Sequence, residues 1–441
     1  MSTTLYDEFL WRGLVYDATE GLADLFATER VTAYIGFDPT ASSLHVGSLM
    51  TVMGLARLQR FGHSPLAIVG GGTGMIGDPS GKSQERVLLS VEQVEANVAG
   101  IRRQLERFLD FGASANAARI VNNADWLTTI DLMSFLRDIG KHFTVNYLLQ
   151  KESVSRRLES EDGISFTEFS YLLLQAYDFL QLFDRVGCTL QMGGSDQWGN
   201  ITAGIELIRK LRAAKAHGLV TPLVTTASGV KFGKTEAGTI WLDPARTPVQ
   251  EFRQFWLNTD DRDVVAYLKY FTFLAHDEIG SLDEITKVAP QKREAQTVLA
   301  DQVSALVHGQ AESARVDQAN RVLFGATTLD VTGDLAVRVA DELTAIADEV
   351  PSTTLPGADF DGDGVTVVDV VVRAFAVSKS EARRLVQQGG LKVNDRKMSD
   401  PEGRLVRGQA IDGRVFLLQK GPRQRHLVRL LDVPESVRDT R

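Results

Sequence analysis

The sequence has a single cysteine, Cys188, and no long apolar run. One cysteine can form neither an internal disulfide framework nor a cysteine zinc site, and it suits a reducing cytoplasm. There is no stretch of 18 apolar residues and no charged-then-apolar N-terminus, so we expect neither a membrane span nor a secretory signal. The composition, 44% hydrophobic over 441 residues, predicts a globular cytoplasmic protein with several domains.

The net charge of −9 is unevenly distributed. Residues 370–441 carry 16 Lys/Arg and 8 Asp/Glu, a net charge of +8, so the rest of the chain carries −17. A small basic region on an acidic body is the pattern expected when only part of a protein meets RNA. The overall acidity therefore does not exclude a nucleic-acid partner.

The first ~220 residues have the pattern of an α/β domain. Short β-prone runs at Thr32–Phe37, Pro65–Val69 and Gly187–Met192 are separated by helical stretches, which predicts a parallel sheet. Residues 131–158 have helical periodicity and few breakers, and residues 248–324 also have a helical pattern.

Residues 325–364 hold nine acids and one base, Arg338, and their later part is rich in Pro, Gly, Ser and Thr. This composition indicates an acidic linker, followed from Val365 by a compact basic α/β unit. The run Asp359–Gly364 (DFDGDG) begins like a calcium loop. Its twelfth position would be Val370 where a bidentate glutamate belongs, which favours the linker interpretation.

The stretch Tyr34–Leu49 (YIGFDPTASSLHVGSL) joins a predicted strand to a predicted helix. His45 and Ser48 are three residues apart, so they lie close together on the first helical turn. A helix N-terminus favours phosphate, and an imidazole there can donate to charge developing on a phosphate in the transition state. The alternative is a helix start with an incidental histidine.

Lys231–Thr235 (KFGKT) places two lysines three residues apart on a glycine-containing loop. Such a loop can hold a β,γ-phosphate as pyrophosphate leaves, although an isolated KxxK is more often a solvated basic turn. Gly77–Ser83 (GDPSGKS) suggests a Walker A loop but has three residues between its glycines where four are needed. We therefore reject the interpretation as a P-loop ATPase.

A narrow polar stripe lies on an otherwise apolar helix. Tyr171, Gln175 and Asp178 stand at i, i+4 and i+7, which places them on one helical face. Polar groups flanked by Leu and Phe are costly to bury without a partner. The stripe predicts a binding site, and a solvated helix face is the alternative.

Several segments resemble those of bacterial tyrosyl-tRNA synthetases, in that family's order and spacing. His45–Ser48 (HVGS) resembles the class I signature HIGH, although Ser48 stands where His or Asn is usual, and Lys231–Thr235 resembles the KMSKS loop. The other matching segments are Gly70–Arg86, Asn122–Trp126, Phe166–Asp178 and Gln191–Ile201.

The resemblance implies a Rossmann-like parallel-sheet catalytic domain at residues 1–226 with a dimerisation insertion at about 120–190. It further implies a KMSKS-type loop with a helical anticodon-side domain at 227–324, the acidic linker at 325–364 and a basic RNA-binding domain at 365–441. The expected partners are ATP with Mg²⁺, L-tyrosine, tRNA(Tyr) and a second copy of the chain, with one tRNA spanning both subunits. We expect no dedicated protein metal site.

The resemblance also implies roles for individual residues. The expected tyrosine-binding residues are Tyr34, Asp78, Asn123, Tyr171, Gln175, Asp178 and Gln197, with Tyr34 and Asp178 at the phenolic hydroxyl and Asp78, Tyr171 and Gln175 at the ammonium group. The expected ATP-binding residues are Gly36, Asp38, Gly47, Gly194, Asp196 and Lys234. The expected catalytic residues are Thr40, His45, Ser48, Lys82, Arg86, Lys231, Lys234 and Thr235.

The segment Val377–Asn394 resembles a small RNA-binding module shared by ribosomal small-subunit protein four, some pseudouridine synthases and bacterial tyrosyl enzymes. Ser378 is a plausible helix N-cap, and Gly389–Gly390 ends the helix. The basic residues expected to contact RNA phosphates are Lys379, Arg383, Arg384, Lys392, Arg396 and Lys397. A merely solubilising surface is the alternative.

Two other functions stay open at this point. A tryptophanyl-tRNA synthetase would share the fold and both signatures, but Tyr34 with Asp178 and the KFGKT loop favour tyrosine. A non-catalytic RNA-binding protein could retain a synthetase scaffold. The complete set of pocket residues and both loop lysines argue against that alternative.

Overall fold

The computed structural model describes residues 4–78, 80, 89–112, 114–159, 163–227, 229, 232–235, 238–316, 333–347, 350–421 and 424–431, with backbone alone at 152, 153, 234 and 235. The chain divides into two compact units, residues 1–308 and 309–441. Each unit is described by itself.

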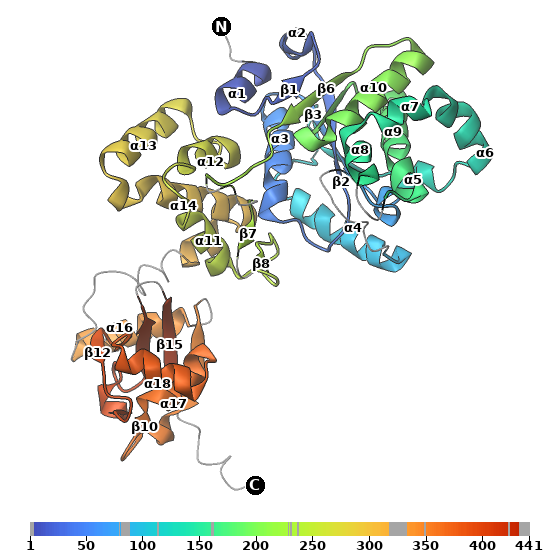
Figure 1. Ribbon diagram of the computed structural model, residues 1–441. Helices are drawn as coiled ribbons and strands as arrows, with labels where there is room; N and C mark the ends of the chain where they lie inside the picture. Colours follow the sequence, from blue (N-terminus) through green and yellow to red (C-terminus); the bar gives the residue numbers. More distant parts are fainter. Residues whose placement is uncertain are drawn as a thin grey trace. The chain divides into compact units, whose positions relative to one another are not determined.

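The first unit is built on a six-stranded sheet (Figure 1), and its mostly parallel pairing confirms the parallel sheet that the β-prone runs predict. Its strands, in spatial order, are β1 (Asp17–Ala18), β6 (His217–Thr221), β5 (Leu190–Gly194), β2 (Thr32–Phe37), β3 (Ser64–Val69) and β4 (Arg119–Asn122). Only β1 runs antiparallel to its neighbour. The order reverses between β5 and β2, so the sheet has a switch point of the kind at which open α/β sheets bind ligands.

Helices cover both faces of this sheet (Figure 1). Ala33, Ile35 and Phe37 of β2 pack in one core with residues of α3 (Leu49–Arg60) and α4 (Val91–Leu105). Tyr34 points to the other face, where it joins residues of α9 (Phe166–Val186) and α10 (Trp198–Arg212). The alternation along β2 follows from the period of a strand, so one strand supplies both cores.

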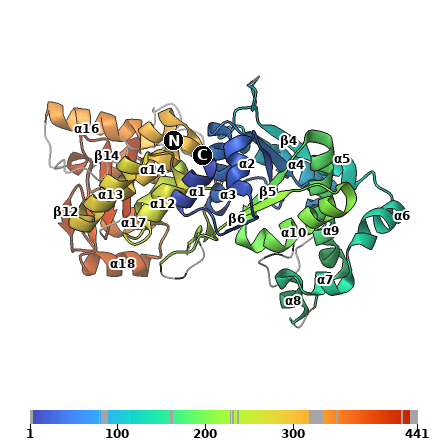
Figure 2. The same ribbon diagram turned by 90° about the horizontal axis from the view of Figure 1, so that it is seen from above.

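Residues 131–158 are helical, but they form short pieces in place of one long helix. These are α6 (Leu132–Ser134), the π-helical η3 (Phe135–Ile139), the 3₁₀ turn η4 (Gly140–His142), α7 (Val145–Leu149) and α8 (Glu152–Leu158). Asp131 and Thr144 each accept a hydrogen bond from a backbone N–H of the following turn and so begin a new helix. Figure 2 shows these pieces together at the end of the unit opposite α13.

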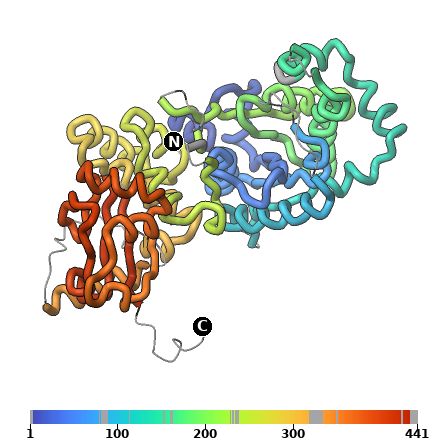
Figure 3. The backbone as a smooth tube through the Cα atoms, turned by 60° about the horizontal axis from the view of Figure 1, so that its bottom comes forward, coloured from blue at the N-terminus to red at the C-terminus, as the bar shows by residue number. Residues whose placement is uncertain are grey.

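Four helices follow the last strand of the sheet: α11 (Val249–Leu257), α12 (Val264–Phe271), α13 (His276–Val288) and α14 (Glu294–His308). They confirm the helical pattern up to residue 308. Between the sheet and these helices, which Figure 3 shows as a tube, the described residues include the antiparallel pair of β7 (Lys234–Thr235) and β8 (Gly238–Thr239).

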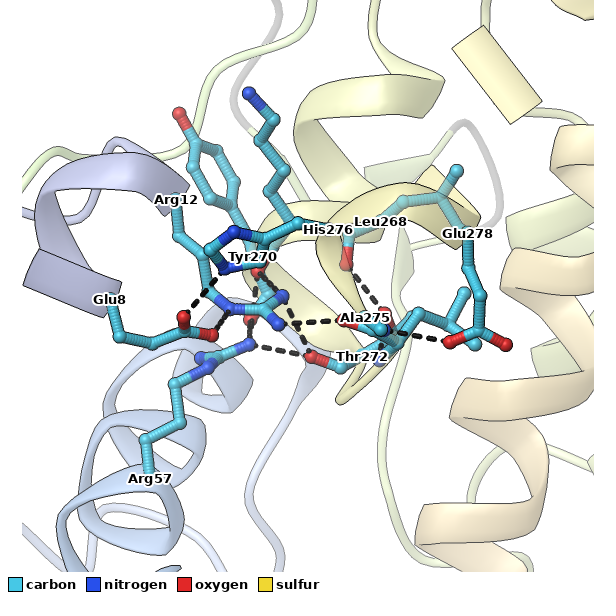
Figure 4. A network of polar contacts seen from close by, with 11 residues as sticks. Glu8, Arg12, Arg57, Leu268, Tyr270, Thr272, Ala275, His276 and Glu278 are labelled. Atoms are coloured by element: carbon cyan, nitrogen blue, oxygen red, sulfur yellow. Dashed lines mark hydrogen bonds and ion pairs between the residues drawn. The ribbon is translucent and has the colours of Figure 1, made fainter. Parts of the chain in front are cut away.

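A buried polar network ties the start of the chain and α3 to the end of α12 (Figure 4). Arg12, at the end of α1 (Leu5–Arg12), donates to the carbonyl oxygens of Lys269, Thr272 and Leu274. Arg57 of α3 donates through Nη2 to the carbonyls of Lys269, Tyr270 and Thr272 at 2.8–3.0 Å.

The network satisfies carbonyl groups that a helix end leaves without intrahelical partners. Part of its positive charge is offset by Glu8, whose carboxylate accepts from Arg12 and contacts His276 Nε2 at 2.7 Å. His276 in turn stacks on Trp11 with ring centroids 3.5 Å apart. α3 and α12 are therefore held together through buried guanidinium groups as well as through apolar packing.

The second unit contains a five-stranded sheet of β12 (Arg396–Met398), β11 (Leu391–Val393), β14 (Val415–Lys420), β15 (Gln424–Leu431) and β9 (Ser352–Pro356), in that order. Helices α17 (Val367–Phe375) and α18 (Lys379–Gln387) pack with it. A two-stranded piece, β10 (Val365–Thr366) with β13 (Arg404–Leu405), completes the described part of the unit.

The prediction of a linker at 325–364 is wrong for its described residues. α16 (Asp334–Ala345) buries Ala336, Val339, Ala340 and Leu343 against Leu417 and Leu427 of the sheet, and β9 pairs in parallel with β15. The apolar side chains recur at helical spacing beneath the acidic ones, so the high acid content marks an exposed helical face. Asp359 and Asp361 pair with Arg373 and Arg407.

The remaining proposed boundaries, near residues 226 and 324, stay predictions, because the first unit is continuous from the sheet through α14. Within the described part of the chain, none of the helices has the length and apolar character needed to cross a membrane.

Candidate active site

The site lies where β2 and β5 separate at the switch point. The two strands pair only at Ala33↔Leu190 and Tyr34↔Gln191, although β2 continues to Phe37 and β5 to Gly194. Beyond Tyr34 their carboxyl ends diverge, and a Cβ placed on Gly36 would meet no atom within 4 Å. This opening is the crevice to which the predicted ligand-binding residues belong.

A tyrosine and an aspartate occupy the buried end of the site. Tyr34 is 1% exposed, and its hydroxyl has no hydrogen-bond partner among the described residues. Asp178 of α9 accepts from Trp126 Nε1 at 2.7 Å and from Asn123 Nδ2 at 2.9 Å. The pKa of Asp178 is raised to about 7, mainly by burial and to a lesser extent by the charge of Asp38, against the lowering effect of those two donors.

The pKa of Tyr34 is also raised, first by burial and then by the charge of Asp178. The hydroxyl therefore stays protonated and can donate. Gln191, opposite Tyr34 on β5, has a buried side-chain oxygen that also has no partner among the described residues. An unpartnered buried donor or acceptor costs about 1–3 kcal/mol, so this end of the site is suited to a ligand with a polar group of its own.

A chain of hydrogen bonds leads from this end along the crevice. Asn123 Nδ2 donates to Thr73 Oγ1 at 3.0 Å, and Thr73 donates to Asp38 Oδ1 at 3.0 Å. The Tyr171 hydroxyl donates to Asp38 Oδ2 at 2.9 Å. Asp38, which the resemblance assigns to ATP, thus lies in contact with a predicted tyrosine-binding residue.

Three amide side chains and Asp78 form a second polar group. Gln197 Nε2 donates to Asp78 Oδ2 at 2.8 Å, and Gln175 Nε2 donates to Gln197 Oε1 at 3.2 Å. Asn200 Nδ2 donates to Gln175 Oε1 at 2.9 Å. The negative charges of Asp38 and Asp78 both act on Tyr171 and raise its pKa, after burial as the main cause. This part of the crevice is therefore suited to a cation.

The structure brings together all seven residues predicted to bind tyrosine. Tyr171 and Asp178 are buried and Gln175 is half-buried, which excludes the solvated-face interpretation of the α9 stripe. Sequence reasoning missed Thr73, Trp126 and Asn200, which hold the others in place. All three lie inside the matching segments, so a search for hydrogen-bonding types within those segments could have found them.

The first signature begins α3. His45 is exposed at the N-terminal side of the turn η1 (Val46–Ser48), and its carbonyl accepts from Ser48 N at 2.8 Å. A Cβ on Gly47 would come within 2.8 Å of His45 Cε1, so only glycine leaves room for the imidazole in this position. Thr40 is exposed in the preceding loop, which follows the open Gly36.

The second signature lies directly beside the first. Val46 N donates to Ile240 O at 3.0 Å, Leu242 N donates to Leu44 O at 2.9 Å, and the His45 and Trp241 rings meet edge to face at 6.0 Å. A Cβ on Gly233 would come within 2.7 Å of Val46 Cγ2. Two segments about 185 residues apart in the sequence are thereby brought together.

Several predicted residues cannot be placed. Lys82, Arg86 and Lys231 lie outside the described residues, as do the side chains of Lys234 and Thr235. Gly194 and Asp196 stand at the end of β5, where a Cβ on Gly194 would come within 2.6 Å of Asp196 Oδ1. The described residues contain no cluster of three or more His, Cys, Asp or Glu that could hold a metal ion.

The six basic residues predicted to bind RNA are all exposed in the second unit. Ser378 caps α18 by accepting from Glu381 N at 3.2 Å, as its sequence pattern predicts. Lys379 and Arg383 pair with Asp369 and Glu402. Lys392 and Lys397 face each other across β11 and β12. Like charges in such positions repel, so this pair disfavours the hairpin unless an anion lies nearby.

Comparisons with known proteins agree with this geometry. Residues 27–325 match the family model of the class I tRNA synthetases for tryptophan and tyrosine, and residues 342–428 match the C-terminal domain of tyrosine–tRNA ligases. The tyrosine–tRNA ligase of Roseiflexus castenholzii is 56% identical over 97% of this chain and 100% of its own length. That of Geobacillus stearothermophilus is 50% identical over 96% and 99%.

Solved structures give the same result. The C-terminally truncated mitochondrial tyrosyl-tRNA synthetase of Aspergillus nidulans superimposes with a TM-score of 0.66 at 33% identity and covers 73% of this chain and 94% of its own. A tryptophanyl-tRNA synthetase of Plasmodium falciparum shares the fold at 14% identity, with a TM-score of 0.50 over 69% of this chain and 84% of its own. The chain therefore belongs to the tyrosine–tRNA ligases, a family of the class I aminoacyl-tRNA synthetases.

Proposed function

We propose that the crevice between β2 and β5 activates L-tyrosine with ATP and then transfers it to the 3′ end of tRNA(Tyr). The observation that carries the assignment of the pocket is the pair of Tyr34 and Asp178 at its buried end. A phenolic hydroxyl can accept from the unpartnered Tyr34 hydroxyl and donate to the Asp178 carboxylate. Phenylalanine would leave the Tyr34 hydroxyl without a partner and would give the Asp178 carboxylate no donor beyond Trp126 and Asn123, and this mismatch disfavours it.

The rest of the pocket suits the other end of the amino acid. Asp78 and Asp38 supply negative charge, and Tyr171, Gln175 and Gln197 supply oriented oxygen atoms for the α-ammonium group. Asn123 acts indirectly, because it orients Asp178 through one hydrogen bond and Thr73 through another. Tyrosine held at both ends directs its carboxylate toward the open, nucleotide side of the crevice.

In the activation step, a tyrosine carboxylate oxygen attacks the α-phosphorus of ATP, the bond to the β-phosphate bridging oxygen breaks, and pyrophosphate leaves. No protein nucleophile is required, so positioning and charge provide the catalysis. Gly36 leaves space for the nucleotide, Gly47 leaves room for the His45 imidazole beside it, and the Asp196 carboxylate beside Gly194 can accept from ribose hydroxyls. The proposed catalytic groups at the phosphates are Thr40, His45, Ser48, Lys82, Arg86, Lys231, Lys234 and Thr235. Mg²⁺ enters with ATP, held mainly by phosphate oxygens and water.

In the second step, a hydroxyl of the terminal tRNA ribose attacks the carbonyl carbon of tyrosyl-adenylate, and AMP leaves. The exposed basic residues of the second unit are suited to hold the body of the tRNA through its phosphates. Lys392 and Lys397 are the best candidates, because their mutual repulsion would be relieved by a bound phosphate.

We further propose that the active form is a homodimer. Leu132 and Met133 are 69% and 72% exposed, and Val145 and Phe166 are also exposed in the same insertion. The insertion is held firmly, since the buried Arg157 pairs with the buried Glu168 at 2.9 Å and so joins α8 to α9. Apolar side chains presented on a rigid, outlying segment are typical of a subunit interface.

The activity is tested by amino-acid-dependent exchange of pyrophosphate into ATP, with tyrosine, tryptophan and phenylalanine assayed separately. We expect exchange with tyrosine alone, and Tyr34→Phe should weaken tyrosine binding about fivefold, near 1 kcal/mol. The free energy of unfolding of the same variant, measured without tyrosine, should rise by about 1 kcal/mol, because the substitution removes an unpartnered buried hydroxyl. Exchange with tryptophan would move the assignment to the sister enzyme, and no exchange would favour the non-catalytic scaffold. Exchange that persists in excess chelator would exclude the role of Mg²⁺.

Tyrosine affinity should depend on pH through Asp178. In the free protein burial holds the pKa of Asp178 near 7, and a bound phenol donating to its carboxylate favours the ionised form. Affinity should therefore be constant above about pH 7 and fall below it, by up to tenfold per unit. Without tyrosine, the same raised pKa means that folding stability falls as pH rises from about 4 to about 7. Calorimetric titration across this range should show the dependence in the wild type and lose it in Asp178→Asn. A flat wild-type profile would contradict the assignment.

The dimer is tested by light scattering on Met133→Glu. A carboxylate at this position would have to be desolvated in the interface, so we expect the mass to fall to that of a monomer. Val288→Glu is the matched control, because Val288 is equally apolar and 82% exposed but lies on α13 at the other end of the unit. A monomeric wild type, or a dimeric Met133→Glu variant, would count against the proposed interface.

The RNA surface is tested with the double variant Lys392→Gln and Lys397→Gln. Affinity for tRNA should fall, and the slope of log affinity against log salt should become shallower by about 1.5, as two phosphate contacts are lost. Stability should not fall, because the variant relieves a like-charge pair. The control is Arg373→Gln with Arg414→Gln, whose charges are already paired with Asp359 and Asp341. An unchanged salt slope in the lysine variant would remove these residues from the interface.

A further inference from the structure

The segments on either side of the second signature are attached to α12. The loop base consists of residues 225–227, 232–233 and 240, which flank or belong to the KFGKT segment. Both carboxylate oxygens of Asp263 accept from Ala227 N at 3.0 Å. One turn further along the helix, the Tyr267 hydroxyl donates to Thr225 O at 3.4 Å. The start of α12 thus holds residues 225–227 of the loop base through polar contacts.

The Asp263 carboxylate does not cap its own helix. Asp263 has helical backbone angles, and its side chain makes no capping bond. The preceding turn begins at Asp260, which accepts from Arg262 N through its side chain at 2.9 Å and from Val264 N through its carbonyl at 3.0 Å. The Asp263 carboxylate is therefore available to hold Ala227.

Phe232 of the loop base is held by aromatic packing. Phe232, between the two lysines of the signature, is 5% exposed. Its ring stacks on Phe271 at 5.3 Å and 9° and meets Tyr267 edge to face at 5.0 Å. Since Tyr267 and Phe271 both belong to α12, the same helix contacts both residues 225–227 and Phe232 of the loop base.

The far end of α12 is fixed to the first signature. The carbonyls of Lys269, Tyr270 and Thr272 accept from the buried Arg57 (Figure 4). Arg57 lies on α3, the helix that begins directly after His45–Ser48. α12 therefore links the two signatures by a second route, besides their direct contact at Val46 and Ile240.

A cavity of about 390 Å³ lies between the loop base and the helices. Thr226, Phe232 and Ile240 line it on the loop side, and Phe255 and Asn258 line it from α11 and its end. Thr226, Phe232 and Ile240 therefore border open space on this side. Among the contacts of the loop base given above, the Asp263–Ala227 pair is the one that involves a charge.

We propose that Asp263 is a positioning residue for adenylate formation, which sets the place of the signature loop relative to His45 by holding Ala227 on α12. The inference rests on the proposed role of the loop lysines at the pyrophosphate. Asp263 lies on α12 and contacts none of the tyrosine-pocket side chains, so its loss should act on the transition state and leave tyrosine binding intact.

The test is pre-steady-state adenylate formation and pyrophosphate exchange by Asp263→Ala. We expect kcat to fall at least tenfold while KM for tyrosine stays within about twofold, since small misplacement of catalytic groups costs rate far more than binding. Asp263→Asn keeps one acceptor oxygen and should recover part of the rate. Tyr267→Phe, which removes only the bond to Thr225, should have a smaller effect in the same direction. Asp277→Ala, an aspartate in the first turn of α13, is the matched control.

Three outcomes would overturn the proposal: a wild-type kcat in Asp263→Ala, a rise in KM for tyrosine that accounts for the loss, or a loss of rate that simply follows a loss of thermal stability. If Asp263→Ala does not fold, Asp263→Asn and Tyr267→Phe decide by the same split between kcat and KM. Failure of the wild type to exchange pyrophosphate with tyrosine would instead reject the proposed function, so the two failures are distinguishable.

Discussion

The divergence of β2 from β5 is the constraint from which the site follows. Two strands that paired along their whole length would satisfy their backbone groups and close the sheet. Here pairing stops at Tyr34↔Gln191, and the last residues of both strands present backbone and small side chains to a crevice. The chain leaves β2 and β5 toward opposite ends of the sheet. No connecting helix therefore runs directly between these two strands across the opening. Tyr34 lies at the point of divergence, which places its hydroxyl at the closed end.

The crevice concentrates negative charge. Asp38, Asp78 and Asp178 lie within one connected region, and their charges raise the pKa of Tyr171 together with burial. The described residues supply hydroxyl, amide and indole donors to these carboxylates. A ligand with an ammonium group at one end and a phenol at the other would offset part of this negative charge and would pair the buried Tyr34 hydroxyl. Selectivity then follows from polar groups that the fold leaves unsatisfied, more than from the volume of the pocket.

Much of this architecture could be predicted from the sequence, because its strands are short apolar runs and the α9 stripe combines residues whose helical spacing is unambiguous. Thr73, Trp126 and Asn200 could not be found from spacing, since their roles depend on contacts across 25 to 52 residues of chain. The linker prediction is wrong for a different reason. The acidic composition of residues 325–364 indicates a linker, whereas Ala336, Val339, Ala340 and Leu343 recur with the period of a helix, which is the stronger signal. In the insertion, the apolar spacing of residues 131–158 is that of a continuous helical stretch. Asp131 and Thr144 each cap a new helix, and these caps divide the stretch into short pieces.

Two departures from local rules lie where function is proposed. The Tyr34 hydroxyl is buried without a partner among the described residues, and Lys392 and Lys397 repel each other across a hairpin. Each departure lowers stability by an amount that a specific partner could return: a phenol at Tyr34 and a phosphate between the lysines. Both depend on ligands from outside the chain, whereas the Asp263 carboxylate is satisfied within it by Ala227 N. Asp263 should therefore affect the rate of the reaction without affecting which amino acid is bound.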